Sequence, residues 1–186
     1  MKKLPILLLL VFFYSAIAYG QEDKLKKIKT LYADTNYKIA KSKLPGEEGW
    51  GNLYSTEINV NSNNGSWRAV GTYSNKIVFW YNDQPGFQQE ENQPDWIVLE
   101  KIEINSLIAI GTMHEEYLYD KGQLVFCYKT TQYGDVPKQE YRYYYWNGKL
   151  FRYLEDQVLK DLNFAKDKEV IDKSIELQKL FLKTFN

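Results

Sequence analysis

The sequence has little of the chemistry on which many metal sites and enzymes depend. Its 186 residues include one cysteine and one histidine. A single cysteine excludes an intramolecular disulfide and any zinc site built from several cysteines. Basic and acidic residues number 24 each, so no basic excess is present to hold a nucleic-acid backbone. We therefore expect no metal, no cofactor and no nucleic-acid partner.

The sequence also has no long apolar run, and a short one lies near the N-terminus. Lys2 and Lys3 precede the apolar residues 6–14, and the small residues Ala18 and Gly20 come shortly before Gln21. This order is typical of a cleavable export signal, and the run is shorter than the roughly 20 apolar residues of a membrane anchor. A lipoprotein would need a cysteine where Gln21 stands. The sequence predicts a signal peptide over residues 1–20 and a soluble periplasmic or secreted protein that is not a lipoprotein.

Residues 21–186 have the length and composition of one folded domain. The chain is 44% hydrophobic and 26% charged, which excludes both a disordered and a membrane-embedded composition. Loss of Lys2 and Lys3 with the signal would leave 22 basic residues against 24 acidic ones. We expect a single α+β domain over residues 21–186.

The first part of this domain combines a helix with a hairpin. Apolar residues recur at helical spacing over residues 23–43, up to Pro45-Gly46, which predicts an amphipathic helix. Residues 54–60 then alternate with period two, as a half-buried strand does. Asn64-Gly65 predicts a type I′ turn that pairs Ile58 with Gly71 and Val60 with Ala69. A further strand over residues 77–81 precedes a polar loop at 82–95.

Residues 96–154 contain a local duplication. Tyr117-x-Tyr119 followed by Gly122 and Leu124 recurs 26 positions later as Tyr143-x-Tyr145 followed by Gly148 and Leu150. Each copy predicts an aromatic strand, a two-residue turn and a return strand. Before them, residues 96–105 and 107–112 predict two short strands or one bent strand. After them, residues 158–165 and 170–185 predict helices. The fold expected is an N-terminal helix, a curved antiparallel meander of about seven to nine strands built from hairpins, and C-terminal helices, with the helices packed on one face.

Aromatic residues are the unusual abundance, with 5 Trp, 16 Tyr and 9 Phe. Counting outward from the turns assigns Tyr117, Tyr119, Leu124, Phe126, Tyr141, Tyr143, Tyr145 and Leu150 to a core face. The opposite face receives Lys129, Arg142, Tyr144, Trp146, Lys149, Phe151 and Tyr153. On that face Trp146 would lie opposite Lys149, Tyr144 opposite Phe151, and Arg142 opposite Tyr153. Arg142, Tyr144, Trp146 and Tyr153 are therefore the candidate ligand-binding residues, because rings edged by cations can stack on a sugar or hold an anionic group.

The remaining polar residues do not form a catalytic set. Alternation along a strand places His114 and Glu116 on one face and Glu115 on the other, and one His–Glu pair is far short of a metal site. Cys127 lies between apolar neighbours and is interpreted as a buried structural residue. Acidic doublets occur at 47–48, 90–91, 115–116 and 155–156. They are interpreted as solvated, because glycoside hydrolysis needs two carboxylates facing each other across a cleft.

These observations favour a non-catalytic exported binding protein of the bacterial cell envelope, whose ligand is a peptide, a glycan or another protein. Two alternatives stay open. The protein could inhibit a secreted enzyme by inserting loop 82–95 or loop 132–137 into its active site. It could also be a carboxylate-based glycan hydrolase.

Overall fold

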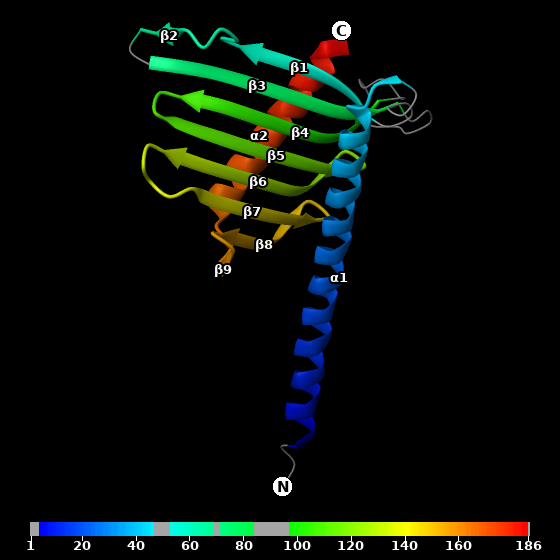
Figure 1. Cartoon of the computed structure of the whole chain (residues 1–186). Coiled ribbons are helices and arrows are strands. Elements are labelled where there is room, and N and C mark those ends of the chain that lie inside the picture. Colours follow the sequence, from blue (N-terminus) through cyan, green and yellow to red (C-terminus); the bar gives the residue numbers. More distant parts are fainter. Residues whose placement is uncertain (1–3, 47–52, 69–70, 84–96, 186) are drawn as a thin grey trace.

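A computed structural model describes residues 4–46, 53–68, 71–83 and 97–185, with side chains described from Gly20 onward. Two α-helices enclose an antiparallel sheet of nine strands (Figure 1). The elements in chain order are α1 (Leu4–Ser42), β1 (Tyr54–Val60), β2 (Ser66–Trp67), β3 (Gly71–Asn82), β4 (Val98–Ile108), β5 (Gly111–Asp120), β6 (Gln123–Tyr133), β7 (Gln139–Trp146), β8 (Lys149–Glu155), β9 (Val158–Lys160), α2 (Phe164–Leu182) and the 3-10 turn η2 (Lys183–Phe185). The expected α+β meander between an N-terminal and a C-terminal helix is confirmed.

Each strand from β3 to β8 pairs with the next one along the chain, and β1 pairs with β3. The short strand β2 pairs with the beginning of β3. The predicted pairing of Ile58 with Gly71 is wrong, because Ile58 lies opposite Ile77. Asn61 and Asn64 adopt positive φ angles, and the amide of Asn61 donates to the Gly65 carbonyl at 2.7 Å. The chain therefore makes a wider turn here than an Asn-Gly hairpin, and the apolar pair Ile58–Ile77 sets the register of β1. Ala69 lies outside the described residues.

The two helices cover opposite faces of the sheet, not one face as expected (Figure 1). On one face, Val170, Leu177 and Phe181 of α2 pack on a buried row that crosses the sheet. That row runs Phe79, Ile102, Tyr117, Cys127, Tyr143 and Tyr153. On the other face, Leu25 and Ile28 of α1 pack on Leu118, Phe126 and Tyr144, and Ile39 packs with Val78 and Trp80. We call these the α2 face and the α1 face.

The helix boundaries differ from the expectation at both ends of the chain. The predicted helix over 23–43 is present within α1, which begins already at Leu4. The predicted helix over 158–165 is wrong, because Val158–Lys160 forms β9 beside β8. Asp156 and Gln157 have positive φ angles, so the chain reverses there and adds a strand. Helix α2 begins after Asn163, whose side chain accepts from the backbone N–H groups of Ala165 and Lys166.

The duplicated aromatic segments form the hairpins β5–β6 and β7–β8, and both copies contain the same bulge. In the first, Tyr119 pairs with Leu124 but Leu118 pairs with Phe126, so Val125 is the extra residue. In the second, Tyr145 pairs with Leu150 but Tyr144 pairs with Arg152, so Phe151 is the extra residue. After a bulge, every later side chain of that strand lies on the face opposite to the one that strict alternation would give it. The two segments of the 26-residue repeat therefore adopt the same hairpin structure, with the bulge at the equivalent position.

Candidate functional site

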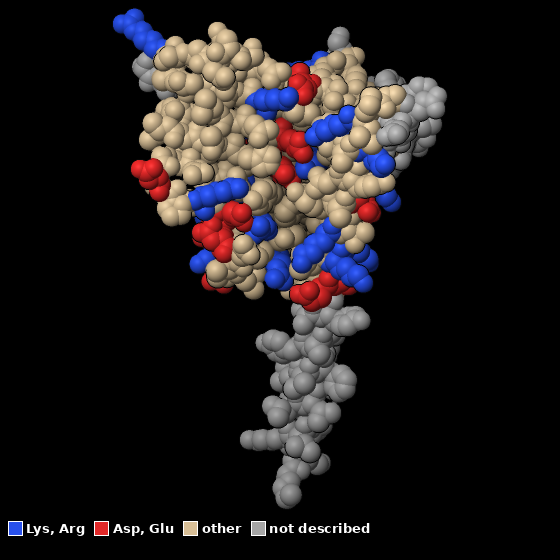
Figure 2. Space-filling model, in the orientation of Figure 1, with Lys and Arg blue, Asp and Glu red and all other residues tan. Residues whose placement is uncertain are grey.

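The α1 face of the sheet is divided into a covered and an open part. Helix α1 crosses the strands near one end, and the sheet beyond it lies uncovered (Figure 1). In the space-filling view of this face, acidic side chains gather near the centre among basic ones, and much of the surface to the left is uncharged (Figure 2). The open part contains a hollow of about 540 Å³, which we call the polar hollow.

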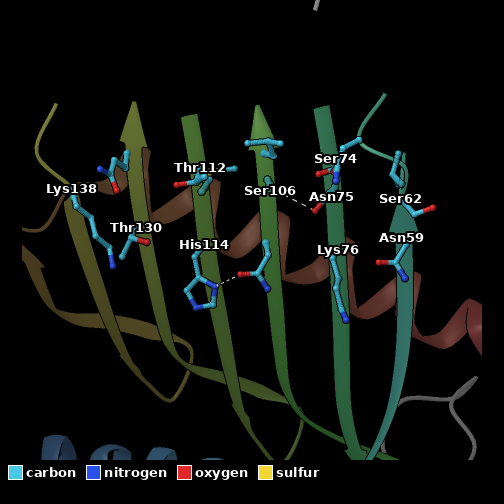
Figure 3. Close-up of a pocket in the computed structure, with 16 residues that line it drawn as sticks. Asn59, Ser62, Ser74, Asn75, Lys76, Ser106, Thr112, His114, Thr130 and Lys138 are labelled. Carbon is cyan, nitrogen blue, oxygen red and sulfur yellow. Dashed lines mark hydrogen bonds between the residues drawn. The ribbon is translucent and has the colours of Figure 1, made fainter. Parts of the chain in front are cut away.

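One cross-strand row of polar side chains forms the floor of the polar hollow. In strand order it consists of Asn59, Lys76, Asn105, His114 and Thr130, each paired in register with the next. Strand alternation turns these residues to the same side as α1 and their sequence neighbours Ile77, Ile104 and Glu115 toward α2. Figure 3 shows four side chains of this row projecting from neighbouring strands into the same space: Asn59, Lys76, His114 and Thr130. Residues from the strand ends complete the hollow: Ser62, Asn64, Ser74, Thr112, Gln132 and Lys138.

Hydrogen bonds hold the middle of the row in place. The Nδ1 atom of His114 lies 2.8 Å from Oδ1 of Asn105 (Figure 3). Its Nε2 atom lies 2.9 Å from Oε1 of Glu116. At the edge of the row, Nζ of Lys76 contacts Oε1 of Glu57 at 2.7 Å. Both ring nitrogens of His114 are engaged, so the imidazole is held rigidly and has no nitrogen turned toward a substrate in this arrangement. The described residues that line the hollow include amides, hydroxyls and lysines but no carboxylate.

A buried charge cluster lies between the polar hollow and the apolar contacts of α1. Lys101 is only 1% exposed, and its ammonium contacts Asn36 of α1 at 2.8 Å and the carboxylates of Glu103 and Glu116 at 2.9 and 3.0 Å. The hydroxyl of Tyr32 donates to Oε2 of Glu116 at 2.6 Å. Two carboxylates thus compensate one buried cation, and side chains from α1 supply further hydrogen bonds. This cluster joins α1 to β4 and β5.

The ionisation of Glu116 depends on this cluster. Burial alone would raise the pKa of its carboxyl group, but hydrogen bonds from His114, Tyr32 and Lys101, together with the charge of Lys101, outweigh burial and lower the pKa to about 2. Burial and the hydrogen bond to Glu116 raise the pKa of Tyr32. Glu116 is therefore ionised at neutral pH and holds both His114 and Tyr32.

The structure separates the four predicted binding residues. Arg142, Tyr144 and Trp146 share one face, as expected, but that face is the α1 face. Tyr153 is buried on the α2 face and stacks on Tyr143 with ring centres 4.8 Å apart. The predicted pairing of Arg142 with Tyr153 is wrong because of the bulge at Phe151, and Arg142 lies opposite Leu154. The bulge at Val125 likewise moves Phe126 from the predicted core face to the α1 face and Lys129 to the α2 face. Whether the three remaining residues bind a ligand stays a prediction.

Helix α1 covers most of this predicted patch. Tyr144 is 7% exposed. Trp146 is half-buried, and the ammonium groups of Lys24 and Lys27 lie 5.9 and 5.7 Å from its ring. Arg142 and Tyr144 line a groove of about 340 Å³ between α1 and strands β6 and β7. The cations near the ring of Trp146 therefore come mainly from α1. The packing of α1 on this patch was not predicted from the sequence.

The other candidate residues are placed as follows. Cys127 is fully buried, which confirms that expectation, and burial raises the pKa of its thiol. Glu115 faces α2, where it contacts Lys173 and, at 3.7 Å, Lys129, whereas Glu116 faces α1. Glu155 is held by Lys166 and Tyr153. The acidic doublets at 47–48 and 90–91 lie outside the described residues, as does nearly all of loop 82–95.

Among the residues with described side chains, no group of three or more His, Cys, Asp or Glu could hold a metal ion. Within the described ranges, no helix combines the length and apolar character required to span a bilayer. Comparisons with protein-family models, with curated proteins and with solved structures found no match. The geometry of the α1 face is therefore the basis for a functional proposal.

The polar hollow was not predicted from the sequence, although the sequence contains a signal for it. Polar residues occupy alternate positions in four neighbouring strands: Lys76 in β3, Asn105 in β4, His114 in β5 and Thr130 in β6. Each strand alone is typical of an ordinary half-buried strand with a solvated face. These residues form one row only because of the pairing registers between the strands. The sequence of a single strand does not determine its register with its neighbours.

Proposed function

We propose that the protein is a non-catalytic binding protein of the cell envelope, exported from the cytoplasm, and that the polar hollow binds a glycan. The observation that carries this proposal is the row of amide, hydroxyl and basic side chains across five strands on an uncovered sheet face. The export signal expected at residues 1–20 provides the cellular context.

A glycan matches the chemistry of the row. Sugar hydroxyls both donate and accept hydrogen bonds, and the side chains of Asn59, Asn105 and Thr130 do the same. A peptide in extended form would bind through its backbone to the edge of a sheet, whereas the hollow lies on the face of the central strands. Lys138 forms no ion pair with the described residues, and Lys76 is paired with Glu57, which does not line the hollow. These two lysines favour a sugar that carries a carboxylate over a neutral one.

The position of His114 supports binding over catalysis at this site. A general acid or base needs a titratable group that can reach the substrate with a nitrogen or oxygen. Here Asn105 and Glu116 hold both nitrogens of the imidazole, and the described lining of the hollow contains no carboxylate. The hollow therefore has the groups that recognise a ligand and lacks the opposed pair that glycoside hydrolysis requires.

Calorimetric titration with an oligogalacturonate tests the proposal, with a neutral cello-oligosaccharide of equal length as the comparison. We expect saturable binding of the acidic oligosaccharide and weaker binding of the neutral one. Asn105→Ala should lower the affinity roughly three- to tenfold, the effect of one lost hydrogen bond. Lys76→Gln should lower the affinity for the acidic oligosaccharide alone.

Lys168→Gln on the exposed surface of α2 is the matched control, since it removes a surface lysine far from the hollow in the chain and on the opposite face. It should leave both affinities unchanged. No heat with either oligosaccharide, or equal loss of affinity in Lys76→Gln and Lys168→Gln, would contradict the proposal.

A further inference from the structure

A second concave site lies on the same face, under the edge of α1. It is the groove of about 340 Å³ lined by Ile28, Lys29 and Tyr32 of α1, Phe126 and Tyr128 of β6, and Arg142 and Tyr144 of β7. We call it the aromatic groove. Its size is at the lower end of small-molecule sites, and its lining differs in kind from the amides and hydroxyls of the polar hollow.

Rings and one aliphatic side chain form the floor of the aromatic groove. Ile28, Phe126 and Tyr144 are buried, and the ring of Phe126 lies 4.9 Å from that of Tyr144 and 5.4 Å from that of Tyr32, edge to face. Contacts between rings fix the orientation of each ring. The floor is therefore a preformed apolar surface lined by rings.

Two cations stand at the rim of this floor. The guanidinium of Arg142 lies over the ring of Tyr128 at 5.3 Å, and its Nη2 donates to Glu140 at 2.7 Å. Glu140 also accepts from the hydroxyl of Tyr128 at 3.1 Å, so one carboxylate holds both side chains. A guanidinium has five N–H donors, and the bond to Glu140 leaves others for a ligand. Lys29 is exposed and forms no ion pair with the described residues.

The surrounding charge is also positive. The part of α1 beside the groove contains Lys24, Lys26, Lys27 and Lys29. The two nearby carboxylates of this segment are already paired, Asp23 with Lys27 at 2.9 Å and Glu22 with Arg152 at 3.5 Å. Arg142 precedes Tyr144 by two positions in β7, and Arg152 lies opposite Tyr144 in β8, so both arginines are on the same face of the sheet as Tyr144. Negative charge would thus be attracted to the rim.

We propose that the aromatic groove is a second binding site, for a small organic anion that carries an aromatic ring. The ring would pack on Ile28, Phe126 and Tyr144, and its apolar surface would thereby be removed from water. The anionic group would meet Arg142 and Lys29 at the rim through charge-assisted hydrogen bonds. This inference does not depend on the glycan proposal, because the two sites have no lining residue in common.

The probe is 2-naphthoate, and its neutral counterpart is 2-naphthalenemethanol. Titration followed by calorimetry or by protein NMR should show saturable binding of the acid and at least fivefold weaker binding of the alcohol. Arg142→Gln should weaken naphthoate binding about tenfold and Lys29→Gln about threefold, with little effect on the alcohol. Glu140→Gln, which removes the carboxylate that competes for Arg142, should strengthen naphthoate binding.

Lys26→Gln is the matched control, because Lys26 is an exposed lysine of the same helix that does not line the aromatic groove. It should bind naphthoate like the unchanged protein, and so should Asn105→Ala, which alters only the polar hollow. Since Lys29 is exposed, Lys29→Gln remains a test even if Arg142→Gln fails to fold. Absence of saturable naphthoate binding, equal affinity for acid and alcohol, or equal effects of Lys29→Gln and Lys26→Gln would overturn the proposal.

Discussion

Single residues at the turns determine how the aromatic hairpins close. Lys121-Gly122 and Asn147-Gly148 have φ angles of 50° and 77°, and of 49° and 70°. Two consecutive positive φ angles define the type I′ turn, whose twist matches that of the flanking strands. Gly65 follows Asn64 in an identical Asn-Gly pair, but it does not adopt a positive φ angle. The two-residue turn predicted at Asn147-Gly148 is therefore confirmed, and the type I′ turn predicted at Asn64-Gly65 is wrong.

This difference predicts unequal effects of the same substitution. Gly148→Ala should lower the free energy of unfolding by about 1 kcal/mol, because a Cβ is unfavourable in the left-handed region. No atom lies within 4 Å of the added Cβ, so the cost would come from the backbone alone. Gly65→Ala, whose Cβ would lie 3.3 Å from Oδ1 of Asn61, should have the smaller effect. Urea unfolding of both variants checks this, and an unchanged midpoint for Gly148→Ala would mean that the turn is misassigned.

Residues also explain where sequence reasoning was right and where it failed. The alternation of Tyr117, Tyr119, Tyr143 and Tyr145 correctly predicted the α2 face, because all four precede their turns and no bulge intervenes. The faces of Phe126 and Tyr153 were predicted wrongly, since each follows a bulge. A bulge changes one position of the pairing without any change in composition, so period-two counting cannot detect it.

At the scale of elements, the polar cluster around Lys101 attaches α1 to the sheet. Helical spacing of apolar residues predicted that α1 exists and which side of it is buried. It could not predict that α1 and α2 pack on opposite faces, because that depends on how the chain leaves each end of the meander. The cluster adds specificity to the contact, since Asn36 and Tyr32 of α1 reach Lys101 and Glu116 only when the helix lies in this one position.

The lowered pKa of Glu116 predicts a pH dependence for this attachment. A carboxyl group whose pKa falls from 4.5 in the unfolded chain to about 2 in the folded one stabilises the fold above pH 4.5. That contribution, of the order of 3 kcal/mol, is lost as the pH falls from about 4.5 toward 2. The difference in unfolding free energy between the unchanged protein and Glu116→Gln should therefore shrink over this pH range.

Glu176→Gln provides the comparison, because Glu176 is an exposed residue of α2. Its unfolding free energy should follow that of the unchanged protein at every pH. Denaturant unfolding between pH 2 and pH 7 measures all three proteins. A constant difference between Glu116→Gln and the unchanged protein would show that Glu116 does not gain its stability from ionisation.

At the scale of the whole molecule, the two faces of one sheet differ in how completely they are covered. The α2 face is closed by Val170, Leu177 and Phe181 and forms the main core. The α1 face is closed only in part, and beyond the charge cluster the strands present amides and hydroxyls to the polar hollow. A sheet face that served stability alone would gain more from apolar side chains under a helix. The proposed binding function would explain why this row is polar.

Backbone amide shifts of the ¹⁵N-labelled protein, followed during titration with the oligogalacturonate, test this central claim most directly. The account predicts that the largest shift changes fall on the adjoining strands β3, β4, β5 and β6 around Lys76, Asn105, His114 and Thr130. Residues of α2 and of the aromatic groove should change little. Saturable changes confined to the groove around Arg142 or to the edge strands, or no changes at all, would contradict it.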